Sequence, residues 1–600
     1  MSPRRSIPPR PLAHRLLAPG LTVLALLALS ACSPNSPTEA DANSVPLAPA
    51  GPLRLALETP IPTLDPAAAS DTVSRRITSQ IFDTLLDWDP AGTTLRPELL
   101  AELPAISDDG LTLTMTMRSG PDARRFAADT CLEGQPRRVR ASDVAASLLR
   151  IDPARHAAYA LLADRIVGLD EHHRSPATTG TTPGIRADDL SNTITLQLTR
   201  PQPELLAILA SPMLAIVPPE CLSYYDGRDP EHPPFARHPV GSGPYVLDHA
   251  RSELPREVLL LRSPEAPADA RLAPLGCPQL PGASPVALTH FHDPEPALRS
   301  FQAGELAAIA PGQSQFAELV ADPATGRLHP GAAPPRSQLL RFPTLSTDLL
   351  VFRMQDPELG QHKDPAIDAR HRALRQAVAL AFDAVRYQRV IRNDAWATQR
   401  ARIVPKSLGG EHDDAVLHRF APPAADLPQA RQILAAADIR GPIVLRYWTG
   451  TDEAEAQEAA ILRDALRPLD IDLQVTRRAH YLGEVLSGSS DAQLFALRYD
   501  ADYLDPASFL APFTCAAPDN YSGFCDPAYD LAFTGFTRIP PGPARDQAAA
   551  TLERLLGDQV PVRPIDQPEA WYVVQPWLQG VTRHPLAGLR IELLCPHTRE

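Results

Sequence analysis

Two short runs of acidic residues and histidines are the places where this sequence could bind a metal ion. Residues 170–173 read Asp-Glu-His-His, and residues 411–414 read Glu-His-Asp-Asp. A metal site needs carboxylate and imidazole groups that converge on one point. Side chains of adjacent loop residues rarely converge, so we expect both runs to be solvated surface and the protein to have no metal or other cofactor.

The sequence also lacks the usual patterns of a catalytic nucleophile or a phosphate-binding loop. It contains neither an H-E-x-x-H nor a G-x-S-x-G motif. Ser242 lies in the segment PVGSGPY (239–245), which has no Lys-Ser/Thr and no nucleophile-elbow pattern around it. Its glycines suit a tight turn with positive φ. We therefore expect that the protein is not an enzyme, with an envelope hydrolase as an alternative.

Residues 16–32, LLAPGLTVLALLALSAC, form an apolar run preceded by four arginines. The run has the length of a signal-peptide core and is too short for a comfortable membrane span. It resembles a bacterial lipoprotein signal, so residues 1–31 would be removed and Cys32 would carry the lipid. An ordinary secretory signal is the alternative. In both cases the protein works outside the cytoplasmic membrane, and residues 32–51 are expected to be a flexible tether.

Six further cysteines remain, an even number that permits disulfides in an exported chain. Cys515 and Cys525 flank a turn-rich stretch and form the first expected pair. Cys221 with Cys277 is the second expected pair. No spacing is C-x-x-C, which argues against a zinc or redox site.

The bulk numbers describe a large acidic protein. The chain has 600 residues, 44% of them hydrophobic, and a formal net charge of -14 at pH 7. Residues 1–31 carry four arginines and no acidic residue, so the mature chain is more acidic still. A nucleic-acid partner would need a basic surface and is not expected.

Hydrophobic periodicity predicts a mixture of strands and helices. Alternation indicates strands at 53–57, 111–117 and 193–198, and helical spacing indicates a helix at 74–86. The C-terminal half alternates strand, helix, strand and strand at 443–448, 453–466, 471–475 and 492–499. This order is typical of a βαβ unit and predicts an α/β fold.

Seven blocks of sequence, in order along the chain, resemble the family 5 extracellular solute-binding proteins, the dipeptide and oligopeptide receptors of ABC importers. No single block is specific for this family, but the order and spacing of all seven blocks together are specific for it. The blocks are LETPIPTLDP (57–66), IFDTLLDWD (81–89), 95–120, PVGSGPY (239–245), ARHRALRQAVALAFD (369–383), DADYLDPASFL (500–510) and NYSGFCDPAYDLAF (520–533).

The resemblance implies a two-lobed α/β periplasmic-binding-protein fold (type II, cluster C) with an extra inserted subdomain. Lobe I would comprise 52–92, 193–287 and 560–600, the inserted subdomain 93–192, and lobe II 288–559. Hinges would lie near 287 and 560.

The resemblance also implies a function. The expected protein captures a small peptide and delivers it to an ABC permease whose ATPase drives uptake. It would work as a monomer that is lipid-anchored in the cell envelope. Alternatives are a sugar, metal chelate, haem or opine in the same fold, and a receptor that senses rather than transports.

The segment DADYLDP (500–506) is the expected ligand site. In relatives, the Asp that matches Asp502 receives the peptide α-ammonium, and a desolvated ammonium needs such a fixed opposite charge. The alternative is that Asp502 only caps a local turn. Tyr499 stands where relatives often carry Trp, and Arg353 where Asn is more usual. The expected ligand-binding residues are Asp502, Tyr499, Tyr503 and Arg498.

Overall fold

A long mixed sheet organises the chain, and it has one strand that belongs to both of its halves. The computed structural model describes residues 48–174, 182–226, 234–267, 285–393, 397–398, 402–409 and 418–597. The signal, Cys32, Cys277 and residues 411–414 lie outside these ranges. Residues 46–600 form one unit, and all of the elements below belong to it.

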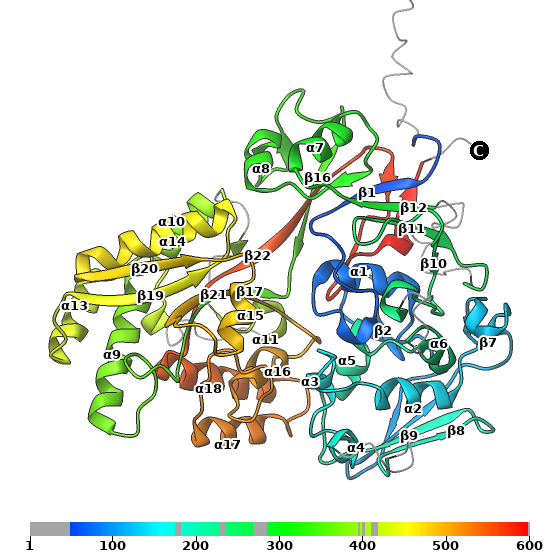
Figure 1. Ribbon diagram of the computed structural model, residues 1–600, viewed down its shortest axis with the longest axis horizontal. Helices are drawn as coiled ribbons and strands as arrows, with labels where there is room; N and C mark the ends of the chain where they lie inside the picture. The colour runs from blue at the N-terminus through cyan, green and yellow to red at the C-terminus, as the bar shows by residue number, and fades with distance from the viewer. Residues whose placement is uncertain are drawn as a thin grey trace, which may run out of the picture. The chain divides into compact units, whose positions relative to one another are not determined.

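The first half of the sheet has the strand order β10, β11, β12, β1, β13, followed by the end of β22 (Figure 1). Strand β1 pairs in parallel with both β12 and β13, and it carries alternate buried residues as its sequence predicts. The bounds are β1 Leu53–Leu57, β10 Tyr245–Leu247, β11 Glu257–Arg262, β12 Val286–His290, β13 Ala308–Ile309, β16 Gln338–Pro343 and β22 Val562–Val574.

The second half continues from the start of β22 through β17, β21, β19 and β20. Strands β19 and β20 are parallel and are joined by α14, which confirms the predicted βαβ unit. Helix α14 begins with a capping box formed by Asp452 and Glu455. The bounds are β17 Ser346–Phe352, β18 Ala397–Thr398, β19 Ile443–Thr449, α14 Glu453–Leu466, β20 Ile471–Arg477 and β21 Leu494–Asp500.

Strand β22 crosses from one half to the other. Its start pairs with β17, from Val351 opposite Val562 to Asp348 opposite Asp566. Its end pairs with β16, from Pro343 opposite Glu569 onward. The short link 344–345 joins β16 to β17 at the same level, so two adjacent chain segments connect the halves.

A separate four-stranded sheet, ordered β4, β5, β9, β8, contains the predicted strands near 111–117 and 193–198. Helix α2 packs on it. The bounds are β4 Ala105–Ile106, β5 Thr112–Thr116, α2 Ala141–Leu149, β8 Ile185–Asp188 and β9 Thr193–Gln197.

Helix α1 differs from its prediction. It runs from Thr72 to Ile81 instead of 74–86, because Phe82 takes an extended backbone and β2 (Leu86–Trp88) pairs with β3 (Leu95–Pro97). The glycines of PVGSGPY contact its end: a Cβ on Gly241 would stand 2.0 Å from the carbonyl oxygen of Ile81. These glycines are therefore needed for close approach rather than for positive φ.

The remaining elements cover the sheets. Helix α9 starts at Pro365 with Asp364 as its N-cap, and α7 and α8 cover Trp571 and Val573 near the end of β22. The helix bounds are α3 Tyr159–Leu162, α4 Leu169–Arg174, α5 Leu205–Leu209, α6 Pro219–Tyr225, α7 Pro294–Gln302, α8 Gln313–Leu319, α9 Pro365–Ala381, α10 Ala384–Ile391, α11 Lys406–Gly409, α13 Leu427–Ala436, α15 Tyr481–Leu486, α16 Ala507–Leu510, α17 Pro527–Phe536 and α18 Pro543–Gln559. Short strands are β6 Arg125–Phe126, β7 Arg137–Arg138, β14 Val320–Asp322, β15 Arg327–Leu328, β23 Leu578–Gln579, β24 Arg583–His584, β25 Gly588–Leu589 and β26 Cys595–Pro596.

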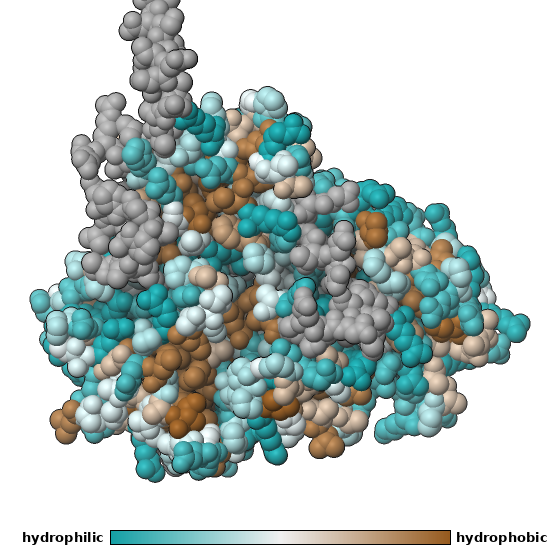
Figure 2. Space-filling view, turned by 180° about the vertical axis from the view of Figure 1, so that it is seen from behind, coloured by the Kyte–Doolittle hydropathy of each residue, from teal (hydrophilic) through white to brown (hydrophobic). Residues whose placement is uncertain are grey.

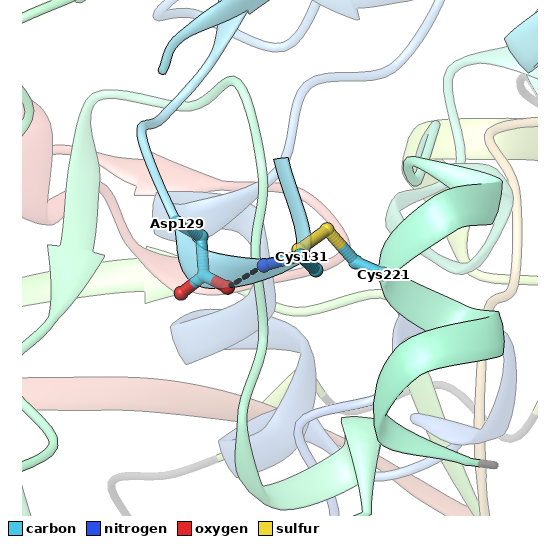
Figure 3. A group of neighbouring side chains, drawn as sticks. All are labelled: Asp129, Cys131 and Cys221. Atoms are coloured by element: carbon cyan, nitrogen blue, oxygen red, sulfur yellow. Dashed lines mark hydrogen bonds between the residues drawn. A yellow bond between two sulfur atoms is a disulfide. The ribbon is translucent and has the colours of Figure 1, made fainter. Parts of the chain in front are cut away.

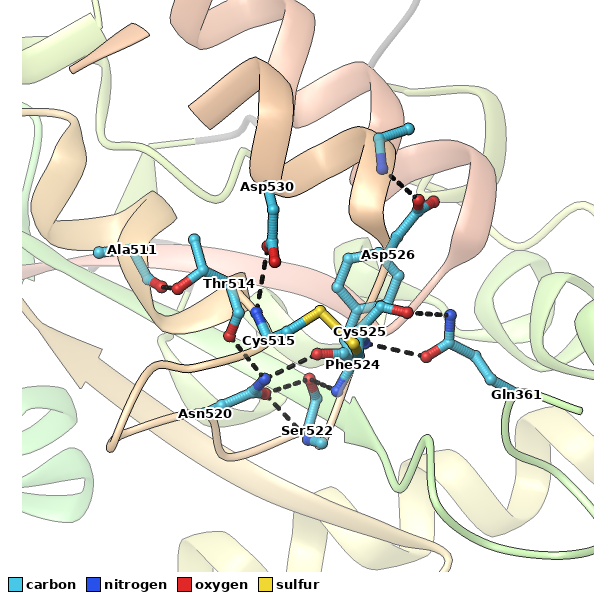
Figure 4. Close-up of a disulfide and its surroundings, with 12 residues drawn as sticks. Gln361, Ala511, Thr514, Cys515, Asn520, Ser522, Phe524, Cys525, Asp526 and Asp530 are labelled. Carbon is cyan, nitrogen blue, oxygen red and sulfur yellow. Dashed lines mark hydrogen bonds between the residues drawn. A yellow bond between two sulfur atoms is a disulfide. The ribbon is translucent and has the colours of Figure 1, made fainter. Parts of the chain in front are cut away.

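The disulfides confirm one expected pair and correct the other. Cys515 and Cys525 are bonded across the loop before α17 (Figure 4). Cys221 is bonded to Cys131 and not to Cys277, because α6 packs beside the turn at Thr130–Leu132 and brings the Cα atoms to 4.9 Å (Figure 3). Cys595 is also disulfide-bonded.

The surface is mostly hydrophilic at the margin of the face in Figure 2, and hydrophobic side chains gather in patches toward its middle. Leu190 and Leu531 are the most exposed of the large hydrophobic residues described. Within the described ranges, no helix combines the length and the apolar composition that crossing a membrane requires.

Candidate ligand-binding cleft

A cleft of about 1050 Å³ lies where the two halves of the sheet meet. Residues of β1, α1, α7, α8 and the end of β22 line it from the first half, and the start of α14 and the end of β21 line it from the second. This volume is at the upper end of the range of about 300–1,000 Å³ for small-molecule sites. The cleft therefore has room for a guest of several residues.

Strand β21 delivers alternate side chains to this cleft because successive strand residues point to opposite faces. Arg498 and Asp500 lie on the cleft side, whereas Tyr499, Ala501 and Tyr503 are buried on the other. The strand ends at Asp500, and the amide of the next residue, Ala501, still donates to the carbonyl of Leu345 at 2.8 Å.

Arg498 is a cleft residue, but its charge is already paired. Its Nε lies 2.7 Å from Asp348 Oδ1, and its side chain is 50% exposed. Asp348 is also bound by the buried Arg392. Burial alone would raise the pKa of Asp348, but Arg498 and Arg392 outweigh it and hold that pKa below its usual range.

Asp500 lines the cleft without an ion pair. It accepts a hydrogen bond from the hydroxyl of Ser346 on β17. Among the described residues, no arginine, lysine or histidine nitrogen approaches its carboxylate within 4.0 Å. Arg583 lines the same cleft and likewise has no carboxylate within that distance in the described ranges. Burial lowers the pKa of Arg583, although Tyr572 and Asp500 oppose the shift.

Asp502 lies outside the set of residues that line the cleft. Its Oδ1 is 3.5 Å from the guanidinium of Arg75 on α1, and its side chain is 25% exposed. Burial raises the pKa of Asp502, Arg75 opposes that shift, and the charge of Asp500 adds to it. The predicted role of Asp502 in holding an ammonium group stays a prediction, and its partner here is a group of the chain itself.

Tyr499 and Tyr503 also lie away from the cleft. The hydroxyl of Tyr499 donates to the carbonyl of Ser508 at 2.9 Å, and its ring packs edge-on against Phe509. Tyr503 is 4% exposed. Tyr499 thereby holds the 507–510 helix in place, and ligand contact by either tyrosine stays a prediction.

Sequence reasoning missed most of the cleft. Glu58 and Arg76 form a bidentate ion pair in the cleft, in which two guanidinium nitrogens donate to the two carboxylate oxygens at 2.9 and 3.0 Å. Asp452 and Glu453 enter from the start of α14. The block 57–66 contains Glu58 and was the available signal for that residue. Nothing in the helical pattern of α14 marks its first turn as a cleft wall.

Other candidate clusters have structural roles. Asp170, in the first acidic run, is on helix α4 and accepts from the Tyr159 hydroxyl at 2.9 Å. Asp129, Cys131 and Cys221 place their ligand atoms within 4.8 Å of one another (Figure 3). Both of these sulfurs are joined in the disulfide, however, and in that form they do not offer thiolate ligands.

Arg353, where the family more often has Asn, binds the carbonyl of Val485 at the end of α15. Its side chain therefore connects the end of β17 to α15 within the second half, and it does not belong to the residues that line the cleft.

Comparisons with known proteins agree with this architecture. The family "Bacterial extracellular solute-binding proteins, family 5 Middle" matches residues 94–521. The peptide transport periplasmic protein SapA of Salmonella typhimurium is 24% identical over 511 residues, covering 83% of each chain. The glutathione-binding protein GsiB of Escherichia coli is 31% identical over 187 residues, covering 31% of this chain and 30% of GsiB.

Solved structures share the fold. The murein tripeptide binding protein MppA of Escherichia coli superposes with a TM-score of 0.70 at 20% identity, covering 92% of this chain and 100% of MppA. The periplasmic binding protein DppA of Helicobacter pylori, in complex with the peptide STSA, gives 0.71 at 18%, covering 91% and 98%. These likenesses confirm the predicted two-lobed α/β fold. With most of its length matched, the chain belongs to family 5 of the bacterial extracellular solute-binding proteins.

Proposed function

We propose that this protein is the solute-binding component of an ABC importer and that it captures short peptides outside the cytoplasmic membrane. Three of the similar proteins above are described as transporting or binding peptides. The observation that carries the proposal is the cleft of about 1050 Å³, which is lined from both halves of the sheet. The guest would be released unchanged to a permease driven by an ATPase.

The connections between the halves support a closing motion. In the part of the chain that the structure describes, β22 and the link 344–345 are the segments that pass between the halves at the cleft. The pairing partner of β22 changes between Asp566 and Glu569. Hinge closure needs a few residues at element ends that absorb the backbone change. We place the hinge at 344–345 and 567–568, while the domain boundaries drawn from the family resemblance stay a prediction.

The charges of the cleft suit a zwitterionic guest. Asp500 and Arg583 present opposite charges to it, and neither has an ion pair within 4.0 Å among the described residues. A short peptide carries an ammonium and a carboxylate group, so it complements both. A neutral sugar would offer neither group an ion pair.

Binding is tested with the mature protein and an equimolar library of Ala-X-Ala tripeptides. Native mass spectrometry should show retained tripeptides at a ratio of one per chain, and each chain should be monomeric. A protein that retains no tripeptide, but arrives from its producing cells with a sugar, metal chelate, haem or opine, would overturn peptide capture. Recovery of cleaved tripeptides would instead indicate an envelope hydrolase.

The place of action is a periplasmic one, and we propose a lipid anchor at Cys32 with residues 32–51 as its tether. Multiple acyl chains give stable membrane attachment. The full chain, expressed with labelled palmitate, should take up label and sediment with membranes. The Cys32→Ser variant should be unlabelled and should appear in the soluble envelope fraction. Equal labelling of both proteins would contradict the anchor.

A further inference from the structure

We propose that Arg75 occupies the position where an ammonium group would meet Asp502, and that Asp500 is the carboxylate that binds the positive group of the guest. This assignment rests on the proposed function and adds a specificity residue to it. It assigns ammonium binding to Asp500, which lines the cleft, instead of Asp502, which does not.

The first observation is the position of Arg75. This residue projects from α1 in the first half of the sheet, and its side chain reaches the 501–502 segment of the second half. Its guanidinium donates to the carbonyls of Ser70 at 2.6 Å and Ala501 at 3.1 Å, and it stands 3.5 Å from Asp502 Oδ1. A positive charge is therefore already in place beside Asp502.

The second observation is that the guanidinium of Arg75 is buried and is held by several partners. Arg75 is 1% exposed and is held by two carbonyls besides the carboxylate. A guest ammonium that displaced it would strand a buried guanidinium without its partners, which is strongly unfavourable. In this arrangement of the two halves, the charge of Asp502 is thus already paired with a group of the chain.

The third observation concerns the acidic residues that line the cleft, of which the described ranges contain six. Four of them are already engaged, two by arginines and two by helix N-termini. The engaged residues are Glu58 with Arg76, Glu569 with Arg341, Asp71 as the cap of α1 and Asp452 as the cap of α14.

Two acidic residues remain, Glu453 and Asp500. Glu453 is exposed at the start of α14 and accepts from the Gln457 side chain at 3.2 Å. Water and salt screen a charge in that position. Asp500 is half-buried at the end of β21, and among the described residues its side chain has one hydrogen-bond partner, the neutral hydroxyl of Ser346. A charge pair formed at Asp500 is less screened and is therefore stronger.

The test compares two tripeptide libraries, Ala-X-Ala with a free amino terminus and the same library N-acetylated. Three isosteric variants are measured: Asp500→Asn, Asp502→Asn and, as a control in the same cleft, Glu453→Gln. Each removes one negative charge with little change in shape. Competition binding gives the ratio of the affinities for the free and the acetylated library.

Wild-type protein should prefer the free library by at least about tenfold, as expected for a partly buried charge pair. Asp500→Asn should reduce the ratio to near one, while Asp502→Asn and Glu453→Gln should leave it within about twofold of wild type. Loss of the ratio in Asp502→Asn with retention in Asp500→Asn would overturn the assignment, as would a ratio near one in wild type. Failure of wild type to bind either library would instead overturn the proposed function.

Discussion

Two groups of charged residues in this protein have different surroundings: one lies at the junction of the two halves of the sheet, and the other lies in the cleft. At the junction of β17, β21 and β22, the buried Arg392 binds both Asp348 and Asp566. In the cleft above this junction, Asp500 and Arg583 have no ion pair within 4.0 Å among the described residues. The junction charges serve the fold of the chain, whereas the cleft charges are available to a guest.

The difference shows how neighbouring parts of one sheet can have separate roles, with buried ion pairs that stabilise the fold and cleft charges that can bind a guest. A buried ion pair is destabilising to break, because the remaining partner becomes an uncompensated buried charge. A charge at an open cleft keeps its water until a guest replaces it, so its loss affects binding more than folding. Variants at the two places should therefore separate stability from affinity.

The largest expected effect is at the junction. Arg392→Met should lower the free energy of unfolding by about 3–5 kcal/mol, because it leaves Asp348 and Asp566 buried without their shared partner. Urea unfolding followed by tryptophan fluorescence measures the loss. Arg498→Gln is the matched control: Arg498 also binds Asp348 but is 50% exposed, so about 1 kcal/mol or less is expected. Equal losses in the two variants would contradict the distinction.

The loop closed by Cys515 and Cys525 offers a second way to separate folding from binding. The disulfide spans 10 residues, and removing it should lower stability by about 2–3 kcal/mol through the entropy of the unfolded chain. The hydrogen bonds from the Asn520 amide to Thr514 and Phe524 keep the local turn in place (Figure 4). The Cys515→Ser/Cys525→Ser protein should unfold at lower urea but bind the free tripeptide library as wild type does. A matching loss of affinity would place this loop in the binding site.

The sequence predicted what depends on neighbours along the chain. The βαβ unit at 443–477 follows from local periodicity, and so does the strand that became β21. What it did not predict depends on contacts between distant segments. The Cys131–Cys221 bond spans 90 residues.

The candidate site shows the same limit. Nothing near DADYLDP indicates that Arg75, more than 400 residues earlier, fills the space beside Asp502. Alternation along β21 shows which side chains share a face, but the position of α1 decides which of them reach the cleft. The family resemblance supplied the correct fold, while the charges inside the cleft could be identified only from the three-dimensional arrangement.

A smaller effect with a definite pH dependence is expected beside the junction. Glu458 on α14 is 8% exposed and accepts from the hydroxyl of Tyr447 at 2.7 Å. Burial raises the pKa of Glu458 to about 7 from an ordinary 4.5. Folding therefore takes up a proton between these two values, and this residue makes the protein less stable as the pH rises from about 4.5 to 7.

Glu458→Gln keeps the acceptor oxygen and removes this penalty. The variant should match wild type near pH 4.5 and exceed it above pH 7 by on the order of 1–2 kcal/mol. Thermal unfolding across this pH range measures the difference. Glu453→Gln, exposed in the first turn of the same helix, should show no such growth. If the stability of Glu458→Gln differed from that of wild type by the same amount at both ends of the pH range, the ionisation of Glu458 would not be involved.

The smallest effect on stability is expected for Asp500→Asn, the variant that should have a large effect on binding. Asp500→Asn keeps an acceptor for the Ser346 hydroxyl and removes a charge that has no ion pair within 4.0 Å in the described ranges. Its free energy of unfolding should stay within about 0.5 kcal/mol of wild type, as for a change away from buried networks. Urea unfolding without ligand measures this value, and adding the free tripeptide library should stabilise wild type more than the variant. A marked loss of stability without ligand would show that Asp500 belongs with Asp348 and Asp566 as a structural charge rather than a binding one.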